Sequence, residues 1–286
     1  MKLKALVFYS ICIFTIFSCK KNNDVTVSTT VTAKVMLNVS YGADPLQNMD
    51  IYLPSFRSTA TTKVMILIHG GSWSSGDKAD VSQYVDTFKR RLPDYAIFNI
   101  NYRLATSSST LFPTQENDIK TAVQFILDQS NANLVSNKVA ILGVSAGGHL
   151  ALLQAYKNIP QIKAKAVVSF FGPTDLTDMY NNPANPLIPT GLVQVIGKTP
   201  TQDPLIYSNS SPINFVTDNV PPTLLLQGGK DDLVKTSQAT SLQTKLLIAG
   251  VSNQYIFYPN EGHGWFGATL SDSFDKIQTF LTLYVN

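Results

Sequence analysis

The stretch that decides the fold is Lys138–His149, KVAILGVSAGGH. Its first seven residues form a continuous apolar run, as expected of a strand buried on both faces of a parallel sheet. The run leads straight into Ser145-Ala146-Gly147-Gly148 and then into a stretch with helical character that continues to Lys157. A buried strand, a tight turn of small residues and a helix in direct succession predict one unit of an alternating α/β fold.

Outward from this segment, strand-like and helix-like stretches alternate along the chain. Further strands are expected at 35–40, 49–53, 63–68, 96–102, 164–170, 223–226 and 255–258, and further helices at 81–92, 114–129, 238–249 and 273–284. This alternation predicts an α/β fold with an open, mostly parallel central sheet and helices on both faces. Residues 34–286 show no internal repeat and no dividing linker, so we expect one domain.

Residues 173–212 interrupt the alternation. They contain seven prolines and several asparagines, and they are too long for an ordinary connection between a strand and a helix. We therefore expect an irregular, lid-like insertion, or a local excursion over the edge of the sheet.

The composition excludes several classes of protein. Of the 286 residues, 44% are hydrophobic and 14% are charged, which rules out disorder of the whole chain. The formal net charge of +3 is small and no run of Lys and Arg forms a stripe, so nucleic acid is a poor candidate partner. The chain's two cysteines, Cys12 and Cys19, cannot build a disulfide framework or a cysteine-based zinc site.

The first residues are typical of an export signal. In residues 1–18 two lysines precede a mostly apolar stretch, 5–17, which is short for a membrane span but right for a signal peptide. The run IFSC ending at Cys19 is similar to a bacterial lipobox, which implies a lipidated, N-terminal cysteine. Residues 19–33 are polar and predict a flexible tether. We expect an exported domain anchored by lipid to a bacterial membrane, the outer membrane in particular; a short membrane anchor helix is the alternative.

Gly143–Gly147 (GVSAG) matches the pattern G-x-S-x-G between a buried strand and a helix. In that context the pattern predicts a nucleophile elbow, in which small neighbours allow Ser145 to adopt a strained turn. The N-terminus of the following helix then offers N–H groups to a developing negative oxygen. The alternative is a structural turn or a phosphate loop, but no G-K-[ST] follows, which excludes a Walker A loop.

A serine nucleophile needs a base, and the chain has three histidines. His149 lies in the first turns of the helix after Ser145, where packing or capping is the expected role. His69 opens His69–Trp73 (HGGSW), which resembles the glycine-rich oxyanion loop of hydrolases. His263, between two glycines after the last expected strand, suits an exposed functional loop and is the predicted base.

The carboxylate that orients the histidine is expected between the serine and the histidine in chain order, in a loop after a strand. Gly228–Val234 (GGKDDLV) is such a loop, and within it Asp231 and Asp232 compete. Asp175 and Asp178, which follow the strand ending near Phe171, are a third alternative.

Taken together, these motifs resemble the carboxylesterase branch of the α/β-hydrolase fold, and within it the BD-FAE group of secreted acetyl-xylan and feruloyl esterases. The resemblance rests on Gly76–Lys78, Asn101–Leu104, Phe171–Leu176, Ser211–Ile213, Pro221–Thr223 and Gly262–Gly264, besides the motifs above. It implies Ser145, Asp231 and His263 as the catalytic residues and backbone N–H groups near Gly70, Gly71 and Ala146 as oxyanion donors. Gln227 stands where these enzymes usually have a histidine outside the triad.

The resemblance implies an ester hydrolase that acts through an acyl-enzyme, without a metal or an organic cofactor. Trp73 and Trp265 adjoin the expected active-site loops, where they are candidates to stack on a sugar ring or an aromatic acyl group, although packing beneath a loop is an equal alternative. An amidase, formamidase or peptidase on the same fold is the nearest rival function. An inactive, hydrolase-like surface binding protein is the second rival.

Overall fold

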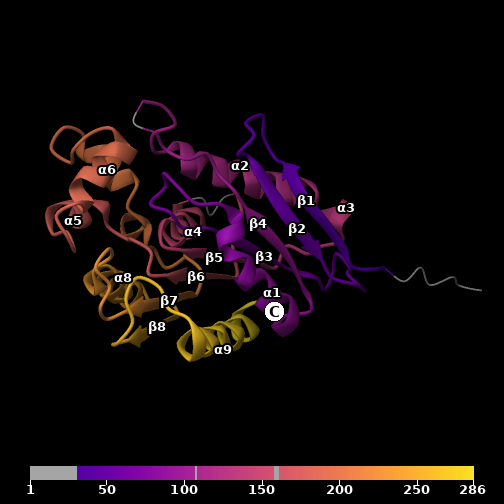
Figure 1. Ribbon diagram of the computed structural model, residues 1–286. Helices are drawn as coiled ribbons and strands as arrows, with labels where there is room; N and C mark the ends of the chain where they lie inside the picture. Colours follow the sequence, from indigo (N-terminus) through magenta and orange to yellow (C-terminus); the bar gives the residue numbers. More distant parts are fainter. Residues whose placement is uncertain (1–30, 107, 158–160) are drawn as a thin grey trace, which may run out of the picture. The chain divides into compact units, whose positions relative to one another are not determined.

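The computed structural model describes residues 31–106, 108–157 and 161–286. The predicted signal peptide 1–18, Cys19 and most of the tether lie outside these residues. The described residues contain an eight-stranded sheet with the order β1-β2-β4-β3-β5-β6-β7-β8 (Figure 1). The strands are β1 (Lys34–Ser40), β2 (Asn48–Leu53), β3 (Lys63–Ile68), β4 (Tyr95–Ile100), β5 (Val139–Val144), β6 (Ala166–Phe170), β7 (Thr223–Gly228) and β8 (Asn253–Tyr258).

The sheet is mostly parallel, as the sequence predicts. Strands β3 to β8 pair in parallel, while β1 and β2 pair antiparallel with each other and β2 pairs antiparallel with β4. Every residue of β4, β6 and β7 is buried, which explains why these strands have no alternation of apolar and polar residues. Strand β2 does alternate, with every second residue buried.

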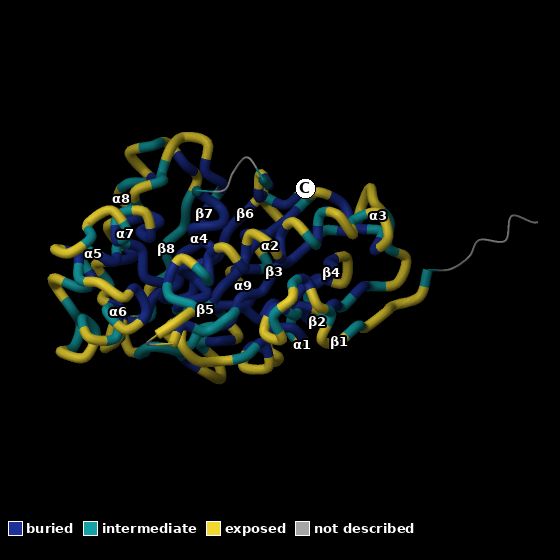
Figure 2. The backbone as a smooth tube through the Cα atoms, turned by 90° about the horizontal axis from the view of Figure 1, so that it is seen from above, coloured by how far each residue is buried: buried dark blue, intermediate teal, exposed yellow. Residues whose placement is uncertain are grey.

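Helices cover both faces of the sheet. Helices α1 (Ser82–Arg91) and α9 (Gly267–Tyr284) pack on one face, and α2 (Thr114–Asp128), α4 (Ala146–Lys157) and α8 (Thr236–Ile248) pack on the other (Figure 1). The two core clusters, one for each face, give the buried centre seen in dark blue in Figure 2. Helix α9 begins six residues before the start predicted from the sequence, because Leu270 already joins the buried face. Short elements η1 (Lys78–Val81) and α3 (Ser130–Asn133) lie in the connections.

The expectation of an irregular segment at 173–212 is wrong. The segment folds into α5 (Leu176–Asn181), α6 (Ile188–Ile196), α7 (Pro204–Asn209) and a turn of 3-10 helix, η2 (Pro212–Phe215). Local capping explains this: Asp175 and Asp203 accept hydrogen bonds from the first N–H groups of α5 and α7, and α6 and α7 carry proline in the first turn, where its missing N–H costs nothing.

The first described residues join the sheet at one particular edge. Lys34 pairs with Leu53, at the end of β2 that lies beside the amino-terminal end of β4. The carbonyl of Val31 accepts a hydrogen bond from Phe56, which fixes the start of this segment. The chain therefore enters the domain at the edge opposite the carboxyl ends of the parallel strands.

Those carboxyl ends carry the predicted site residues. His69 follows β3, Ser145 follows β5, Asp231 comes three residues after β7, and His263 comes five residues after β8. Loops at this edge of an open parallel sheet commonly form the ligand site. Separately, none of the helices in residues 31–106, 108–157 and 161–286 has the length and apolar character needed to cross a membrane.

Candidate active site

Ser145 occupies a strained turn between β5 and α4. Its φ angle is +54°, a left-handed value that L-residues rarely adopt, and its N–H donates to Phe170 O at 2.9 Å. The turn is possible because its neighbours are small: a Cβ on Gly143 would lie 2.0 Å from Gly147 O, and one on Gly147 would lie 2.2 Å from Ile68 O. The sequence G-x-S-x-G thus reflects backbone segments in direct contact, with the serine side chain half-exposed at the turn.

His263 connects Ser145 to a carboxylate. Its Nε2 lies 2.8 Å from Ser145 Oγ, and its Nδ1 lies 2.8 Å from Asp231 Oδ2. The side chain of His263 is 14% exposed and that of Asp231 is fully buried. A buried carboxylate on Nδ1 requires the N–H tautomer at that nitrogen, which leaves Nε2 free to accept the serine proton.

Asp231, and not its neighbour, faces His263. Its Oδ1 accepts hydrogen bonds from the N–H groups of Leu233 (2.9 Å) and Val234 (2.8 Å). Asp232 is exposed, and its carbonyl accepts a hydrogen bond from Asn185. The other two alternatives have local partners: Asp175 caps α5, and Asp178 accepts hydrogen bonds from Asn182 and Gln238.

Gln227 is a residue of this site whose role the sequence analysis did not assign. It is fully buried at the end of β7, and its Nε2 donates to Asp231 Oδ2 at 2.9 Å and to Val234 O at 3.0 Å. Gln227 therefore fixes both the acid and the loop that carries it. The signal for this role in the sequence is a polar residue at the carboxyl end of an otherwise apolar strand.

The glycine-rich loop after β3 lies against Ser145. Gly70 is so close to Ser145 that an added Cβ would lie 3.2 Å from the serine Cβ. Gly71 has φ of +104°, and a Cβ there would lie 2.1 Å from Ser75 O. Among the described residues, neither the N–H of Gly71 nor that of Ala146 donates a hydrogen bond to the protein. N–H groups without a protein partner are what an oxyanion site requires, and the assignment of these two to such a site stays a prediction.

His149 connects the glycine-rich loop to the segment after α7. Its Nε2–H donates to Ser210 O at 2.6 Å, and its Nδ1 accepts the indole N–H of Trp73 at 3.1 Å. Complete burial lowers the pKa of His149 to about 4, so the ring is neutral at neutral pH. His149 has no contact with Ser145 Oγ and acts as a structural tie, as expected from the sequence.

His69 is also structural. It is fully buried, its ring stacks on Tyr102 at 4.3 Å between centroids, and burial lowers its pKa. The Tyr102 hydroxyl donates to the carbonyls of His69 and Gly70 at 3.1 and 3.2 Å. The segment Asn101–Ala105 thus supports the glycine-rich loop from beneath, and Ala105 N adds a hydrogen bond to Trp73 O.

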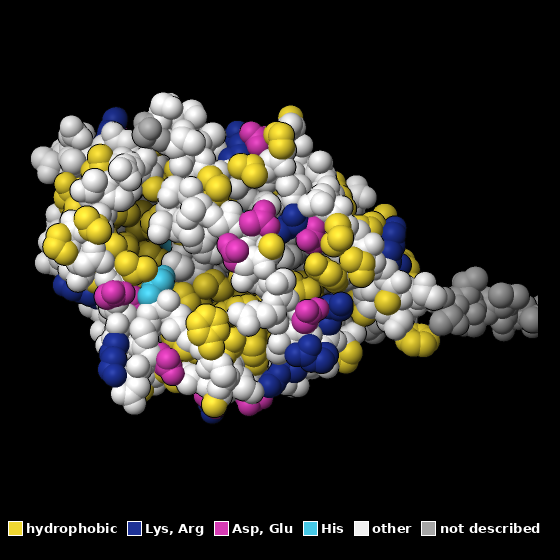
Figure 3. All heavy atoms as spheres, in the orientation of Figure 1, with side chains coloured by type: hydrophobic (Ala, Val, Ile, Leu, Met, Phe, Trp, Pro, Cys, Tyr) yellow, Lys and Arg dark blue, Asp and Glu magenta, His cyan; other side chains and the backbone are white. Residues whose placement is uncertain are grey.

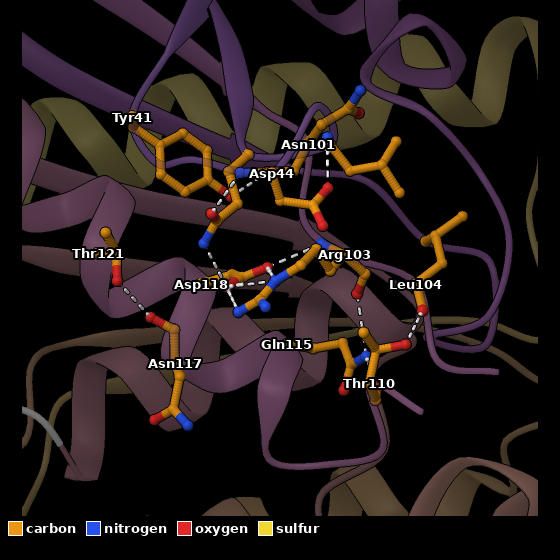
Figure 4. Close-up of polar contacts among 12 residues, drawn as sticks. Tyr41, Asp44, Asn101, Arg103, Leu104, Thr110, Gln115, Asn117, Asp118 and Thr121 are labelled. Carbon is orange, nitrogen blue, oxygen red and sulfur yellow. Dashed lines mark hydrogen bonds and ion pairs between the residues drawn. The ribbon is translucent and has the colours of Figure 1, made fainter. Parts of the chain in front are cut away.

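An ion pair holds this supporting segment in place (Figure 4). The guanidinium of Arg103 binds both carboxylate oxygens of Asp118, at 2.6 to 3.2 Å, and the Arg103 N–H donates to the same carboxylate. Asp118 is 1% exposed and Arg103 is 30% exposed, so solvent screens only part of the pair. Tyr41 adds a hydrogen bond to Asn101 O and Gln115 one to Arg103 O.

The two tryptophans lie in the walls of the site with most of each ring buried. Trp73 is 5% exposed and donates to His149, while Trp265 is 4% exposed and donates to Ser273 Oγ at 2.8 Å. Trp265 packs among Phe170, Phe171 and Tyr258. Both rings pack beneath the loops while Trp265 lines the open cavity and Trp73 lines the small one, so stacking of either ring on a substrate stays a prediction.

Two spaces adjoin the serine: an open cavity of about 350 Å³ and a small one of about 40 Å³, both lined by Ser145 and His263. A third space of about 290 Å³ shares lining residues with the small one but does not include Ser145. Figure 3 shows histidine at the surface beside a hollow edged by hydrophobic side chains; His69 and His149 are both 0% exposed. Within the described part of the chain, no group of three or more His, Cys, Asp or Glu side chains is placed to hold a metal ion.

Comparison with known proteins finds esterases. The chain is 29% identical over 242 residues to esterase LipC of Mycobacterium tuberculosis, a match that covers 79% of this chain and 59% of LipC. It spans 53–59% of the length of the first curated relatives it matches.

Solved structures give the same fold. A bifunctional GH43-CE protein of Bacteroides eggerthii superposes with a TM-score of 0.74 and 25% identity, covering 86% of this chain and 38% of that one. A truncated form of a carbohydrate esterase from gut microbiota superposes with a TM-score of 0.73 and 26% identity. The match covers 88% of this chain and 98% of that one. The fold is thus that of an α/β-hydrolase, as the sequence predicts. The family model BD-FAE matches residues 49–246, more than half of the chain, and the protein therefore belongs to the BD-FAE family.

Proposed function

We propose that this chain is a serine hydrolase that cleaves carboxylic esters, with Ser145 as nucleophile, His263 as general base and Asp231 as the orienting acid. The observation that carries the proposal is the unbroken series of 2.8 Å contacts from Asp231 through His263 to Ser145, at the floor of an open cavity. The esterases among its relatives support the choice of bond.

In the proposed mechanism His263 takes the Ser145 proton as the hydroxyl attacks the ester carbonyl. The N–H groups of Gly71 and Ala146, with those near Gly70, bind the negative oxygen, and each such donor contributes about 3 kcal/mol to the transition state. His263 then protonates the leaving alcohol. A water activated by the same histidine attacks the acyl-enzyme and releases the acid.

The proposed substrates are acetyl or feruloyl esters of plant polysaccharides. Membership of the BD-FAE family and the similarity to a carbohydrate esterase support this choice. A panel of acetylated xylan, feruloylated sugars, p-nitrophenyl acetate and the matching anilide tests it. We expect ester hydrolysis to exceed amide hydrolysis in kcat/KM; the reverse would favour an amidase.

A fluorophosphonate probe tests the nucleophile directly. We expect the wild type to be labelled, Ser145→Ala to lose labelling, and Ser237→Ala, which removes an exposed hydroxyl of α8 that lines neither cavity beside Ser145, to retain it. A folded wild type without labelling or hydrolysis would support the alternative of a surface binding protein.

We also propose that the domain is exported and held at a bacterial membrane by lipid on Cys19, which lies outside the described residues. The lipobox-like sequence before Cys19 supports this proposal. Fractionation of cells expressing Cys19→Ala tests it: we expect the domain to leave the membrane fraction. Retention of the variant in membranes would contradict lipidation.

A further inference from the structure

The two spaces that adjoin Ser145 differ in size, and both are lined by more apolar than polar surface. The open cavity of about 350 Å³ includes the exposed polar side chains of Asp80 and Gln83, and Phe266 at its rim is 78% exposed. The small space of about 40 Å³ includes Ala146, Pro173 and Val234 and is mostly apolar. Both contain His263, so both adjoin the position that an ester would occupy.

Met179 from α5, Ile188 from α6 and Leu233 from the loop of Asp231 line both the small space and the 290 Å³ cavity, and we call these three side chains the partition. Ser72 and Trp73 of the glycine-rich loop also line both spaces. Met179 is 8% exposed, Ile188 is half-buried and Leu233 is 38% exposed. Two of the three come from the segment 173–212. Beyond them, the larger cavity continues along α6 past Gly191, where an added side chain would meet nothing within 4 Å.

Size decides which part of an ester enters which space. With the carbonyl oxygen at the N–H groups of Gly71 and Ala146, the acyl substituent and the leaving alcohol extend in different directions from Ser145. A polysaccharide cannot enter 40 Å³, so its sugar must lie in the open cavity. The acyl substituent then faces the small space, which holds little more than one water molecule of about 30 Å³.

We propose that the small space is the acyl pocket, that it accepts an acetyl group, and that Met179, Ile188 and Leu233 exclude longer and aromatic acyl groups from the cavity behind them. The inference rests on the proposed function and narrows its substrate class to acetyl esters of carbohydrates. A feruloyl group is too large for this pocket unless the partition is removed.

The wild type tests the pocket first. Rates with p-nitrophenyl acetate, butyrate and hexanoate and with methyl ferulate are compared as kcat/KM. We expect acetate to exceed hexanoate at least about 100-fold, because a pocket of fixed volume rejects additional methylene groups. Hydrolysis of hexanoate or methyl ferulate as efficiently as acetate would overturn the acyl assignment. It would leave the serine hydrolase proposal intact, since that proposal fails only if neither labelling nor hydrolysis occurs.

Opening the partition tests its role. Ile188→Ala joins the small space to the cavity behind it, so we expect the hexanoate-to-acetate ratio to rise at least about tenfold. Leu233→Ala removes the partition from the opposite segment and is expected to act in the same direction, which keeps the test valid if one variant folds poorly. Val193→Ala, a similar truncation on α6 that lines none of the three spaces, is the matched control and should leave the ratio unchanged.

Filling the 290 Å³ cavity should reverse the effect of Ile188→Ala. Gly191→Phe in the Ile188→Ala background places a ring in the 290 Å³ cavity, and we expect the gain in hexanoate hydrolysis to disappear. An unchanged acyl profile in both Ile188→Ala and Leu233→Ala, in folded proteins that react with the fluorophosphonate probe, would show that the partition does not limit the acyl group.

Discussion

The two walls of the proposed active site are built in different ways. The wall formed by His69–Trp73 is tied by buried hydrogen bonds to His149, Tyr102 and Ala105. The opposite wall, the segment 173–212, is a series of short helices that leave Leu187 and Leu205 79% and 71% exposed.

In the proposed mechanism the first wall serves the reaction itself, and the second wall selects the substrate. The glycine-rich loop must hold N–H donors at fixed positions, because misplacement of a donor directly raises the transition-state energy. Short helices capped by their own residues can change side chains without disturbing that loop. We therefore expect substitutions in the first wall to lower kcat, and substitutions in the second wall to change which ester reacts.

The largest effect is expected at the acid. Asp231→Asn removes the charge that stabilises the imidazolium and favours the wrong tautomer of His263, so kcat should fall by about 10⁴-fold. Asp232→Asn makes the same chemical change on an exposed neighbour and should leave kcat within about twofold. Steady-state kinetics with p-nitrophenyl acetate measure both. Equal losses in the two variants would contradict the assignment of Asp231.

A methyl group added to the glycine-rich loop His69–Trp73 should have the next largest effect. Gly71→Ala forces a Cβ against Ser75 O at a φ of +104°, which displaces the loop that presents the oxyanion donors. We expect kcat to fall about 10²- to 10³-fold with a small change in KM. Gly191→Ala, on α6 where there is open space, is the control. Little loss in kcat for Gly71→Ala would mean that this loop does not bind the oxyanion.

The burial of His149, which is hydrogen-bonded to the loop His69–Trp73, predicts a dependence of stability on pH. The pKa of His149 is about 4 in the folded chain, against an ordinary value of 6.5 for a histidine in water, so the unfolded chain binds the proton first as pH falls. The resulting stability is complete above about pH 6.5 and is lost between 6.5 and 4, with about 3 kcal/mol at stake. His149→Gln retains a donor and an acceptor but does not titrate. Urea unfolding at several pH values should show a smaller loss in this variant; an equal loss would assign the effect to other groups.

The smallest effect is expected in the opposite wall, the segment 173–212. Leu205→Ser replaces an exposed side chain of α7 that lines none of the three spaces, so the free energy of unfolding should change by less than about 0.5 kcal/mol. Thermal unfolding and p-nitrophenyl acetate hydrolysis check this expectation. A large loss of either would show that the second wall is as constrained as the first.

The sequence predicted the sheet well because its strands are buried on both faces. Short, continuous apolar runs such as Lys63–Ile68 and residues 223–226 are recognised as buried strands because the helices of this chain show a regular helical period instead. The six-residue helices α5 and α7 are too short to show such a period. Their capping residues, Asp175 and Asp203, were the available signal, but the high proline content suggested irregular structure instead.

The candidate site was predictable in its residue types and less so in its details. The turn at Ser145 follows from local sequence, because only small neighbours permit it. The choice between Asp231 and Asp232 depends on the path of one loop, which local sequence does not determine; the family resemblance implied Asp231, and the structure places that residue beside His263. The partition at Ile188 depends on contacts between segments far apart in the chain. The catalytic roles of these residues stay predictions.

The entry point of the chain has a practical consequence. The described chain begins at Val31, near the place where Lys34 pairs with Leu53, at the opposite end of the strands from Ser145. A resin, bead or fusion partner attached ahead of Val31 would therefore meet the domain on its rear side. Attachment directly at Val31 would leave the loops that carry Ser145 on the side away from the support, where an insoluble polymer could reach them, whereas random chemical coupling would not favour this arrangement.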